Sequence, residues 1–573
     1  MLSSRRLLTL GLVFSLLLVL ALVQALRVQV VEGQRYAAQA RYQQLKTYLN
    51  PAPRGRIFDR SGAVLAVSQR AYLVRLDPAA LSAEPDLSAQ VSALAEALSP
   101  ATGRPVEQLQ QQIRGIIADS RSPTPTLSTI LAYNLSPEVT HMLTTTVAAR
   151  KLRGLLVEKG WARVYPQGLV AGPLIGFVSL QPKGYAGVEG YYDSELNPPP
   201  GVRRERGRTD VLVVTPTLEG ADLVLTVDLA LQTYVEQRLQ QALQETRAQS
   251  GVIVVMDTRT GAILASAVAP GYDPNRAVEL AAQPGLLVDP VVSVPYEPGS
   301  VLKVMTIAAG LEKGLITPNS ILTDTGRLVI SGRAIRNAEG IRRGRASIED
   351  VLALSLNVPT AQIALDLGAK DFYERLSLFG FGSITGIDLA NESPGRLRTP
   401  RDVEWSRTDL ATNSFGQGMM ATPIQVLNAF NTVANDGMWM QPYVVRKWKP
   451  VNSTVVHKQP TPSRVVISAE TARTLRELMA RASRRATPQA LPPECPAAGK
   501  TGTAEWYRNG VRQETTIVTY VGFAPVLEPR FTVLVKLDQP QSSRWAAPTT
   551  GPVFRDVVAY LCRRAGIASA RAG

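Results

Sequence analysis

The first hydrophobic feature of the chain is a 20-residue apolar stretch at residues 7–26, interrupted by only three polar side chains. At about 1.5 Å per residue, one helix of this length crosses the hydrocarbon layer of a bilayer. Arg5 and Arg6 precede the stretch, and basic residues on the short side of a span stay in the cytoplasm. The pattern therefore predicts a membrane helix at 7–26, a cytoplasmic stub at 1–6 and an extracytoplasmic body.

A cleaved signal peptide is the alternative, because Val23, Gln24 and Ala25 loosely resemble a cleavage site. The apolar core is long for a signal peptide, and Gln24 and Leu26 make a mediocre site, so we favour a retained anchor. Either outcome places the rest of the chain outside the cytoplasm.

Residues 27–222 alternate short strand-like runs, turn residues and polar helical segments such as 108–117. No group of nucleophile, acid or metal ligand stands out there, so this part is expected to be a support domain. The segment 197–201, with three consecutive prolines, and the arginine-rich run 203–208 predict an exposed loop. A domain boundary is expected close to this loop.

The second predicted domain, 223–564, has strand patterns at both of its ends. Apolar, β-branched runs predict strands at 251–257, 262–269, 499–507, 514–523 and 530–537, with an Asn509-Gly510 turn between the third and fourth. Helices are expected at 229–244 and 551–563, residues 300–480 are expected to be mostly helical, and 565–573 to be a frayed tail. Pairing of the two strand groups predicts an α+β fold, with one antiparallel sheet flanked by helices.

The formal net charge of +15 raises the question of nucleic-acid binding, but no basic stripe is combined with stacking aromatics. We interpret the charge as a basic surface facing an anionic envelope or membrane. The only histidines are His141 and His457, and neither has a second ligand or an acid at metal-site spacing. We therefore expect no metal, no cofactor and no histidine-based triad.

Cys495 and Cys562 are the only cysteines and cannot build a disulfide framework. One bridge between them is permitted in an oxidising compartment. We expect both to be structural, and the sequence leaves their pairing open.

Ser300 and Lys303 form a Ser-x-x-Lys pair at the start of an apolar run. Pro298 and Gly299 precede it and predict a helix start near Ser300, with both side chains on one helical face. A lysine in an apolar interior has a lowered pKa, and its neutral amine can take the proton of a neighbouring hydroxyl. The pair predicts a serine nucleophile, although a capping serine followed by a surface lysine explains an isolated motif more often.

Two further motifs favour the nucleophile. Ser355 and Asn357 form Ser-x-Asn after a helix-like run, and Lys500-Thr501-Gly502 lies on a predicted strand. Each pattern occurs once, in the order Ser-x-x-Lys, Ser-x-Asn, Lys-Thr-Gly. This set resembles the motifs of penicillin-binding proteins and serine β-lactamases.

Other segments resemble the class B penicillin-binding proteins, which are monofunctional transpeptidases without a glycosyltransferase domain. Residues 54–62 with Leu65-Ala66 are similar to the juxtamembrane motif of that family, and Gly187-Val188-Glu189 to its pedestal motif. Motifs of its transpeptidase domain resemble residues 379–395, 414–418 and 422–425. The resemblance implies a penicillin-binding transpeptidase fold at 223–564 and an elongated, β-rich pedestal of the dimerisation type at 27–222.

The resemblance also implies a role for each motif residue. Ser300 would attack the penultimate D-Ala carbonyl of a stem peptide, release the terminal D-Ala and form an acyl-enzyme. Lys303 would be the base, Ser355 would relay a proton to the leaving amine, and Asn357 would orient Lys303 and the substrate amide. An amine of a second stem peptide would complete the cross-link, whereas β-lactams would acylate Ser300 and stall.

The strand motif would bind the substrate. Lys500 and Thr501 would attract the terminal carboxylate, and Gly502 and Thr503 would extend this substrate-binding segment. The backbone N–H groups of Ser300 and Thr503 would form the oxyanion hole.

Two positions depart from the pattern of the family. Asn337 stands where relatives often have Asp, and Pro359 follows the Ser-x-Asn motif where a small residue is commoner. Neither change removes a catalytic group, so we interpret both as lineage variation.

Three alternatives stay open. A D,D-carboxypeptidase or β-lactamase shares the motifs but transfers the acyl group to water, and a non-catalytic scaffold would only recruit a wall polymerase. The anchor, the pedestal and the intact motifs favour a transpeptidase. Residues 296–300 and 500–504 resemble the division type more than the elongation type, which implies septal cell-wall synthesis with a polytopic glycan polymerase and division proteins as partners.

Overall fold

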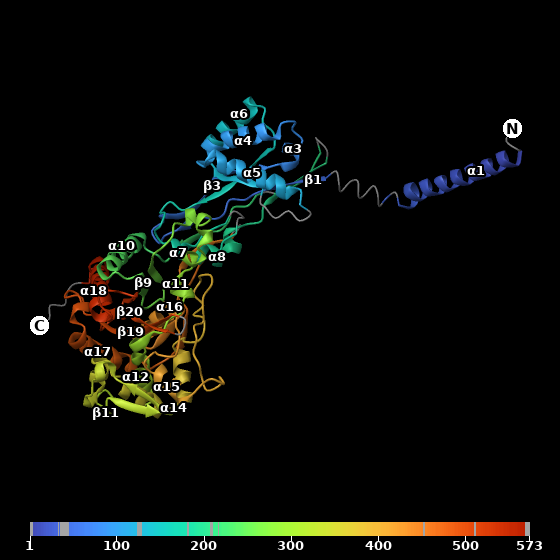
Figure 1. Cartoon of the computed structure of the whole chain (residues 1–573). Helices are drawn as coiled ribbons and strands as arrows, with labels where there is room; N and C mark the ends of the chain where they lie inside the picture. Colours follow the sequence, from blue (N-terminus) through green and yellow to red (C-terminus); the bar gives the residue numbers. More distant parts are fainter. Residues whose placement is uncertain are drawn as a thin grey trace. The chain divides into compact units, whose positions relative to one another are not determined.

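The computed structural model describes residues 4–32, 34, 45–122, 129–179, 183–206, 210–215, 217–450, 453–508 and 511–567. The chain forms two compact units, coloured along the sequence in Figure 1. The first unit contains Met1–Pro53, Ala71–Trp161 and Pro198–Glu219, and the second contains Arg54–Arg70, Ala162–Asn197 and Gly220–Gly573. Each unit is therefore assembled from segments that are far apart in the sequence.

The N-terminal helix α1 (Ser4–Leu26) continues as a π-helical turn at Arg27–Val31. Its residues Gly11–Val30 are apolar enough, and form a long enough helix, to cross a membrane. The apolar helix predicted at 7–26 is confirmed, and its orientation in a membrane stays a prediction.

The rest of the first unit packs helices on short strands. Leu94, Leu98 and Ile113 are fully buried at its centre. Side chains of Asp77, Asp86 and Ser136 accept backbone N–H groups where three of the helices begin, which fixes those helix starts. The elements are α3 (Pro78–Ser82), α4 (Leu87–Thr102), α5 (Val106–Ser120), β4 (Ile130–Leu135) and α6 (Pro137–Ala149), and α5 includes the predicted helix at 108–117.

A three-stranded antiparallel sheet also belongs to the first unit, in the order β1 (Leu45–Asn50), β6 (Gly201–Arg206) and β7 (Asp210–Thr215). The loop predicted at 203–208 is therefore wrong for residues 203–206, which form the central strand. Residues 207 and 208 lie outside the described residues. Backbone hydrogen bonds to neighbours on both sides hold this strand, and the arginine run gives no apolar alternation from which to predict it.

The second unit begins with a sheet that contains β2 (Ile57–Phe58), β3 (Val64–Leu76), β8 (Asp222–Leu225), β16 (Val445–Lys449) and β17 (Val456–His457). The parallel pair β2–β8 joins residues 57 and 58 to residues 223 and 224. Strands β3 and β5 (Leu155–Val164) pair with one another, and each has residues in both units.

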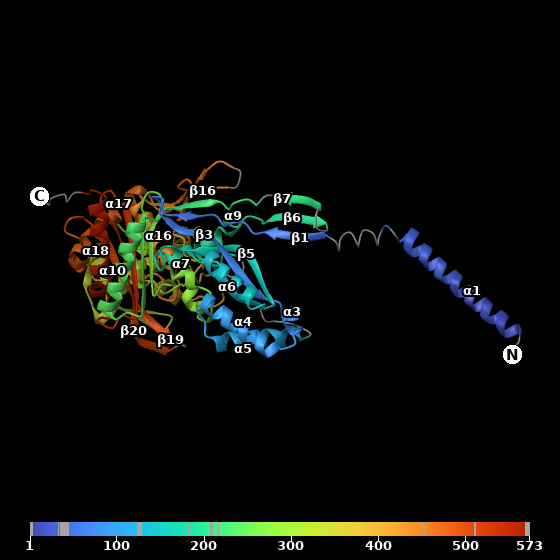
Figure 2. The same ribbon diagram turned by 90° about the horizontal axis from the view of Figure 1, so that it is seen from above.

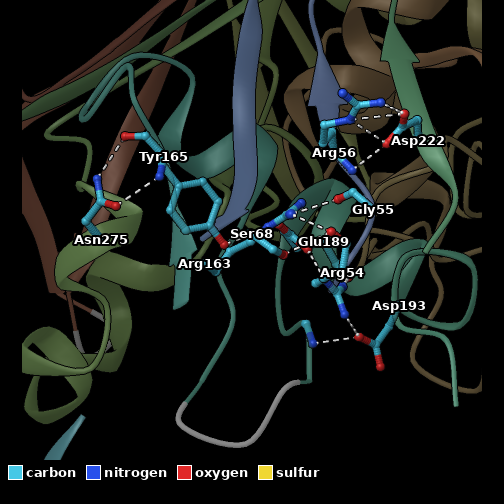
Figure 3. Close-up of polar contacts among 11 residues, drawn as sticks. Arg54, Gly55, Arg56, Ser68, Arg163, Tyr165, Glu189, Asp193, Asp222 and Asn275 are labelled. Atoms are coloured by element: carbon cyan, nitrogen blue, oxygen red, sulfur yellow. Dashed lines mark hydrogen bonds and ion pairs between the residues drawn. The ribbon is translucent and has the colours of Figure 1, made fainter. Parts of the chain in front are cut away.

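A buried charge cluster in the second unit joins the short helices α8 (Gly187–Tyr191) and α9 (Asp193–Leu196) to this sheet (Figure 3). Arg54 Nε lies 2.5 Å from Glu189 Oε2, Arg163 Nε lies 2.6 Å from Glu189 Oε1, and Arg54 Nη1 lies 2.6 Å from Asp193 Oδ1. Burial alone would raise the pKa of Glu189, but the two guanidinium groups hold it below its usual value. The motifs at 54–62 and 187–189 thus meet in one ion-pair network.

The main sheet of the second unit has five antiparallel strands, in the order β10-β9-β21-β20-β19. Their bounds are β9 (Ser250–Asp257), β10 (Ile263–Ala269), β19 (Ala498–Arg508), β20 (Val511–Ala524) and β21 (Phe531–Asp538). All five predicted strands are confirmed, and the pairing of β9 with β21 joins the two ends of the domain as expected. The Asn509-Gly510 turn lies outside the described residues.

Helices cover both faces of this sheet (Figures 1 and 2). On one face, α10 (Leu229–Thr246) and α18 (Ala546–Arg564) pack against strand residues such as Val255 and Val535. On the other, α16 (Pro423–Ala434) packs with α12 (Lys303–Glu312) and α17 (Ala469–Ala486). Burial on both faces explains why β9, β10 and β21 are apolar almost throughout. A disulfide between Cys495 and Cys562 ties the segment before β19 to α18.

Residues 300–480 are less helical than predicted, because short strand pairs separate the helices. Residues 321–347 form two antiparallel pairs, β11 (Ile321–Asp324) with β14 (Gly344–Ser347) and β12 (Arg327–Ile330) with β13 (Arg333–Arg336). Four-residue strands give too little period-two pattern to be predicted. The other elements are α11 (Pro290–Ser293), α13 (Ile348–Ala353), α14 (Asn357–Leu378), α15 (Arg407–Asn413), β15 (Met438–Met440) and β18 (Pro462–Val465).

Candidate active site

Ser300 lies in a 3-10 turn, Gly299–Leu302, that runs directly into α12. The helix start predicted near Ser300 is thus confirmed, with the turn preceding the α-helix proper. The side chain of Ser300 is partly exposed, whereas Lys303, one turn later, is fully buried. The hydroxyl is accessible from outside, and the amine approaches it from the interior.

Two glycines allow other segments to approach the serine turn closely. A Cβ on Gly416 would lie 2.1 Å from the Gly299 carbonyl oxygen, and a Cβ on Gly502 would lie 2.6 Å from the Pro298 carbonyl oxygen. The Gly299 N–H also donates to the Gly416 carbonyl at 3.1 Å. These contacts leave no room for a side chain, so the motifs at 414–418 and 500–502 pack backbone against backbone on the turn.

The Lys303 amine is surrounded by oxygen atoms of two serines. Its Nζ lies 3.0 Å from Ser300 Oγ, 2.9 Å from Ser355 Oγ and 2.5 Å from the Ser355 carbonyl oxygen. Burial lowers the pKa of Lys303 well below its usual value, and the positive charge of Lys500 lowers it further. The structure therefore places an amine with a lowered pKa at hydrogen-bond distance from the Ser300 hydroxyl.

Ser355 lies between α13 and α14 with φ 53°, in the left-handed region. This conformation is uncommon outside glycine and asparagine and is kept only where surrounding contacts hold it. Its Oγ lies 2.9 Å from Lys303 Nζ and 3.1 Å from Lys500 Nζ. One hydroxyl thus bridges two lysines.

Lys500 lies on β19, the edge strand of the main sheet, and is 6% exposed. Its Nζ lies 3.2 Å from both the carbonyl oxygen and Oγ1 of Thr501. Burial lowers the pKa of Lys500 to about 7. Thr501 and Thr503 are partly exposed and alternate with buried Lys500 and Gly502, as the strand period requires.

The two backbone donors predicted for an oxyanion hole come from adjacent segments. A Cβ on Gly299, the residue before Ser300, would lie 3.3 Å from the backbone nitrogen of Thr503. The edge strand and the serine turn are therefore in contact where the N–H groups of Ser300 and Thr503 are expected to act together.

Asn357 begins α14, and its side-chain amide donates to the Arg336 carbonyl at 2.9 Å. The hydrogen bonds that the structure records for Lys303 run to the two serines, so the expected contact between Asn357 and Lys303 is not among them. Asn337, which the sequence marks only as a departure from the family pattern, accepts the N–H groups of Asn357 and Val358 at 2.8 and 3.0 Å. No pattern around Asn337 indicates that its side chain is buried, so the sequence gives no signal of this role.

Within the described ranges, no group of three or more His, Cys, Asp or Glu side chains is arranged to hold a metal ion. His141 and His457 are both exposed and lie apart from the serine and lysine motifs in the sequence.

Comparison with known families assigns most of the described chain to two domains. Residues 251–559 match the penicillin binding protein transpeptidase domain, and residues 49–225 match the penicillin-binding protein dimerisation domain. The first match covers more than half of the chain and includes every residue of the candidate site.

Curated relatives are similar over nearly the whole length. The chain is 29% identical to the penicillin-binding protein PbpB of Mycolicibacterium smegmatis, covering 96% of this chain and 88% of the relative. It is 29% identical to the peptidoglycan D,D-transpeptidase FtsI of Escherichia coli, covering 94% and 88%. Among solved structures, penicillin-binding protein 3 of Mycobacterium tuberculosis in complex with ampicillin has a TM-score of 0.68 at 25% identity, covering 91% of this chain and 98% of that one.

Proposed function

The chain belongs to the penicillin-binding protein transpeptidase family, and on this premise we propose that it is a peptidoglycan D,D-transpeptidase with Ser300 as its nucleophile. The observation that carries the proposal is the convergence of Ser300, Lys303, Ser355 and Lys500 from three separate segments. Consecutive pairs of their side-chain atoms lie 3.0, 2.9 and 3.1 Å apart.

The first half of the reaction forms an acyl-enzyme. Lys303 takes the proton of Ser300, whose Oγ attacks the carbonyl carbon of the penultimate D-Ala of a stem peptide. The N–H groups of Ser300 and Thr503 stabilise the oxyanion of the tetrahedral intermediate. The peptide C–N bond then breaks, and the proton passes through the Ser355 hydroxyl to the leaving amine of the terminal D-Ala.

Lys500 is the last of these four hydrogen-bonded side chains, and its charge serves to bind the substrate. Lys500 and Thr501 attract the terminal carboxylate of the stem peptide, and Gly502 and Thr503 line the same edge strand. The side-chain amide of Asn357 donates a hydrogen bond to the Arg336 carbonyl. We expect this amide to turn towards the substrate amide and Lys303 when a peptide is bound.

The second half of the reaction transfers the acyl group. An amine of a second stem peptide attacks the ester carbonyl, the bond to Ser300 Oγ breaks, and the proton of the amine returns to Ser300 through Lys303. The product is a cross-linked peptide. A β-lactam would acylate Ser300 in the same way and block it.

The proposed biological setting is argued from similarity to relatives. Similarity to FtsI of Escherichia coli and PbpB of Mycolicibacterium smegmatis supports a septal role. We propose that α1 anchors the chain in the cell membrane with its body outside, and that residues 27–222 form the pedestal for a catalytic domain at 223–564. The proposed partners are a polytopic glycan polymerase and division proteins.

One experiment tests the nucleophile. The variant Ser300→Ala should lose labelling by a fluorescent penicillin and should form no cross-linked product from stem peptides, whereas Ser463→Ala, at an exposed serine on β18, should keep both. Intact-mass analysis should show one penicillin adduct, and peptide mass spectrometry after digestion should place it on the peptide that contains Ser300. Normal cross-linking by Ser300→Ala would overturn the proposal, and release of D-Ala without cross-linked product would indicate a carboxypeptidase.

A further inference from the structure

A basic surface beside the proposed site has no part in the mechanism above. Between residues 325 and 347 the chain has six arginines but a single acidic residue, Glu339. The side chains of all six arginines are exposed. Arg343 Nε lies 3.5 Å from Asp350 Oδ1. Within the part of the chain that the structure describes, the other five arginines have no ion pair. We call four of these five the arginine surface: Arg327, Arg336, Arg342 and Arg345. Arg333 is left out because it pairs with Ile330, on the other face of the β12–β13 hairpin.

The strand register places like charges opposite one another. Arg327 on β12 pairs directly with Arg336 on β13, so both side chains stand on the same face of the hairpin. The opposite face contributes Ile330 and Ile335 to a small core with Phe415. Like charges at directly opposed positions destabilise a strand pair. Binding of an anion would remove this repulsion.

The arginine surface starts next to the Ser-x-Asn motif. The Arg336 carbonyl accepts the Asn357 side-chain amide at 2.9 Å, and the next residue, Asn337, accepts the Asn357 N–H at 2.8 Å. A polymer whose reacting peptide reaches Ser300 therefore has its adjoining parts close to this hairpin. On the proposed function, that polymer is a glycan strand with many stem peptides, and each stem peptide carries carboxylates.

We propose that the arginine surface is a docking site for the carboxylates of a peptidoglycan strand whose stem peptides react at Ser300. This inference rests on the proposed function. Guanidinium groups bind carboxylates through paired hydrogen bonds, and a cluster of them raises the local concentration of a polyanion. The attraction between exposed charges is screened by salt, so binding should weaken as ionic strength rises.

The test measures binding of the full-length, detergent-solubilised protein to purified insoluble peptidoglycan from which phosphate-bearing polymers have been removed. The surface variant carries Arg→Gln at 327, 336, 342 and 345. A control variant carries the same change at four exposed arginines elsewhere in the second unit: 259, 407, 446 and 473. The surface variant should bind peptidoglycan at least about tenfold more weakly than the unchanged protein, which is the size of effect expected when a cluster of charges that attracts a polyanion is removed. The control should bind like the unchanged protein.

Acylation by a small β-lactam separates this inference from the proposed function. Both variants should be acylated at the rate of the unchanged protein, because the substitutions keep the Arg336 carbonyl that accepts Asn357 and change none of the side chains assigned to the reaction. If the unchanged protein is not acylated by the β-lactam, the proposed function itself is wrong. The double variant Arg327→Gln/Arg336→Gln controls for loss of binding through unfolding. Removal of a like-charge pair should not lower its Tm, and the variant should still bind peptidoglycan more weakly than the unchanged protein.

Equal binding by the surface variant and the control would overturn the docking site. Two other results would also overturn it by naming a different ligand: binding only to peptidoglycan that retains its phosphate-bearing polymers, or an arginine-dependent binding to anionic lipid vesicles without any to peptidoglycan.

Discussion

The side-chain oxygen of Asn337 accepts the backbone N–H of Asn357 at 2.8 Å, which fixes the first turn of α14 next to Ser355. The amide nitrogen of Asn337 donates to Asp324 Oδ1 and Oδ2 at 2.8 and 3.0 Å. Asp324 is fully buried, and Asn337 is 4% exposed. One amide thus connects a buried carboxylate to the loop that holds Ser355 in its left-handed conformation.

Replacing Asn337 by Ala should impair both stability and acylation. The change leaves two helix N–H groups and the Asp324 carboxylate without this partner, and a buried unsatisfied group costs roughly 1–3 kcal/mol. Because the Ser355 loop would shift, penicillin acylation should slow by up to about a hundredfold. Urea unfolding and stopped-flow acylation measure the two effects, and an unchanged acylation rate would contradict the positioning role of Asn337.

The variant Asn337→Asp should make stability depend on pH. Asp still accepts the two N–H groups, but its carboxyl lies against the buried carboxyl of Asp324, so one of the two has a raised pKa. A carboxyl whose pKa is raised on folding contributes stability at low pH that is lost as pH rises. The Tm of this variant should fall between about pH 5 and pH 8 relative to the unchanged protein. Parallel Tm curves would show that the two side chains do not interact.

Lys500→Arg should extend activity to higher pH. Burial lowers the pKa of Lys500 to about 7, so the charged form that attracts a carboxylate is lost as pH rises through that value. Arginine keeps its charge at any working pH. The alkaline limb of kcat/KM for acylation, which reports the free enzyme, should therefore move upward in Lys500→Arg even if its maximum is lower. If the alkaline limb of kcat/KM does not move in this variant, a group other than Lys500 causes it.

Arg54→Ala should destabilise the second unit far more than Arg56→Ala. The Arg54 side chain is 5% exposed and pairs with fully buried Glu189, so its removal should cost about 3–5 kcal/mol. The Arg56 side chain is 55% exposed in its pair with Asp222, for which the expected cost is at most about 1 kcal/mol. Chemical denaturation measures the free energy of unfolding of both variants. Similar losses of this free energy would contradict the importance of burial.

Gly416→Ala should disturb the serine turn. A Cβ at this position would lie 2.1 Å from the Gly299 carbonyl oxygen, and Gly416 also has φ 80°. Gly314→Ala is the matched control, because Gly314 has φ 69° but nothing within 4 Å of the added Cβ. Both variants should lose the roughly 1 kcal/mol of a left-handed residue, but only Gly416→Ala should lose most of its penicillin acylation. Equal acylation would show that the turn tolerates the contact.

Local patterns in the sequence determined the longer elements of the second unit. The five strands of the main sheet, α10, α18 and the apolar helix at the N-terminus were all predicted, because each is long enough to show a clear period or an unbroken apolar run. The order of the three motifs also predicted that Ser300, Lys303, Ser355 and Lys500 belong to one site, and the structure brings these four side chains together.

Only the tertiary structure decided what depends on contacts between distant segments. The sequence does not show that β6 pairs on both sides, that Cys495 and Cys562 are bridged, or that Asn337 supports the Ser355 loop. It also does not fix how far burial lowers the pKa values of Lys303 and Lys500, because desolvation depends on every side chain packed around the amine. Periodicity reports which face of an element is buried, whereas the partner that buries it is set by the folded chain as a whole.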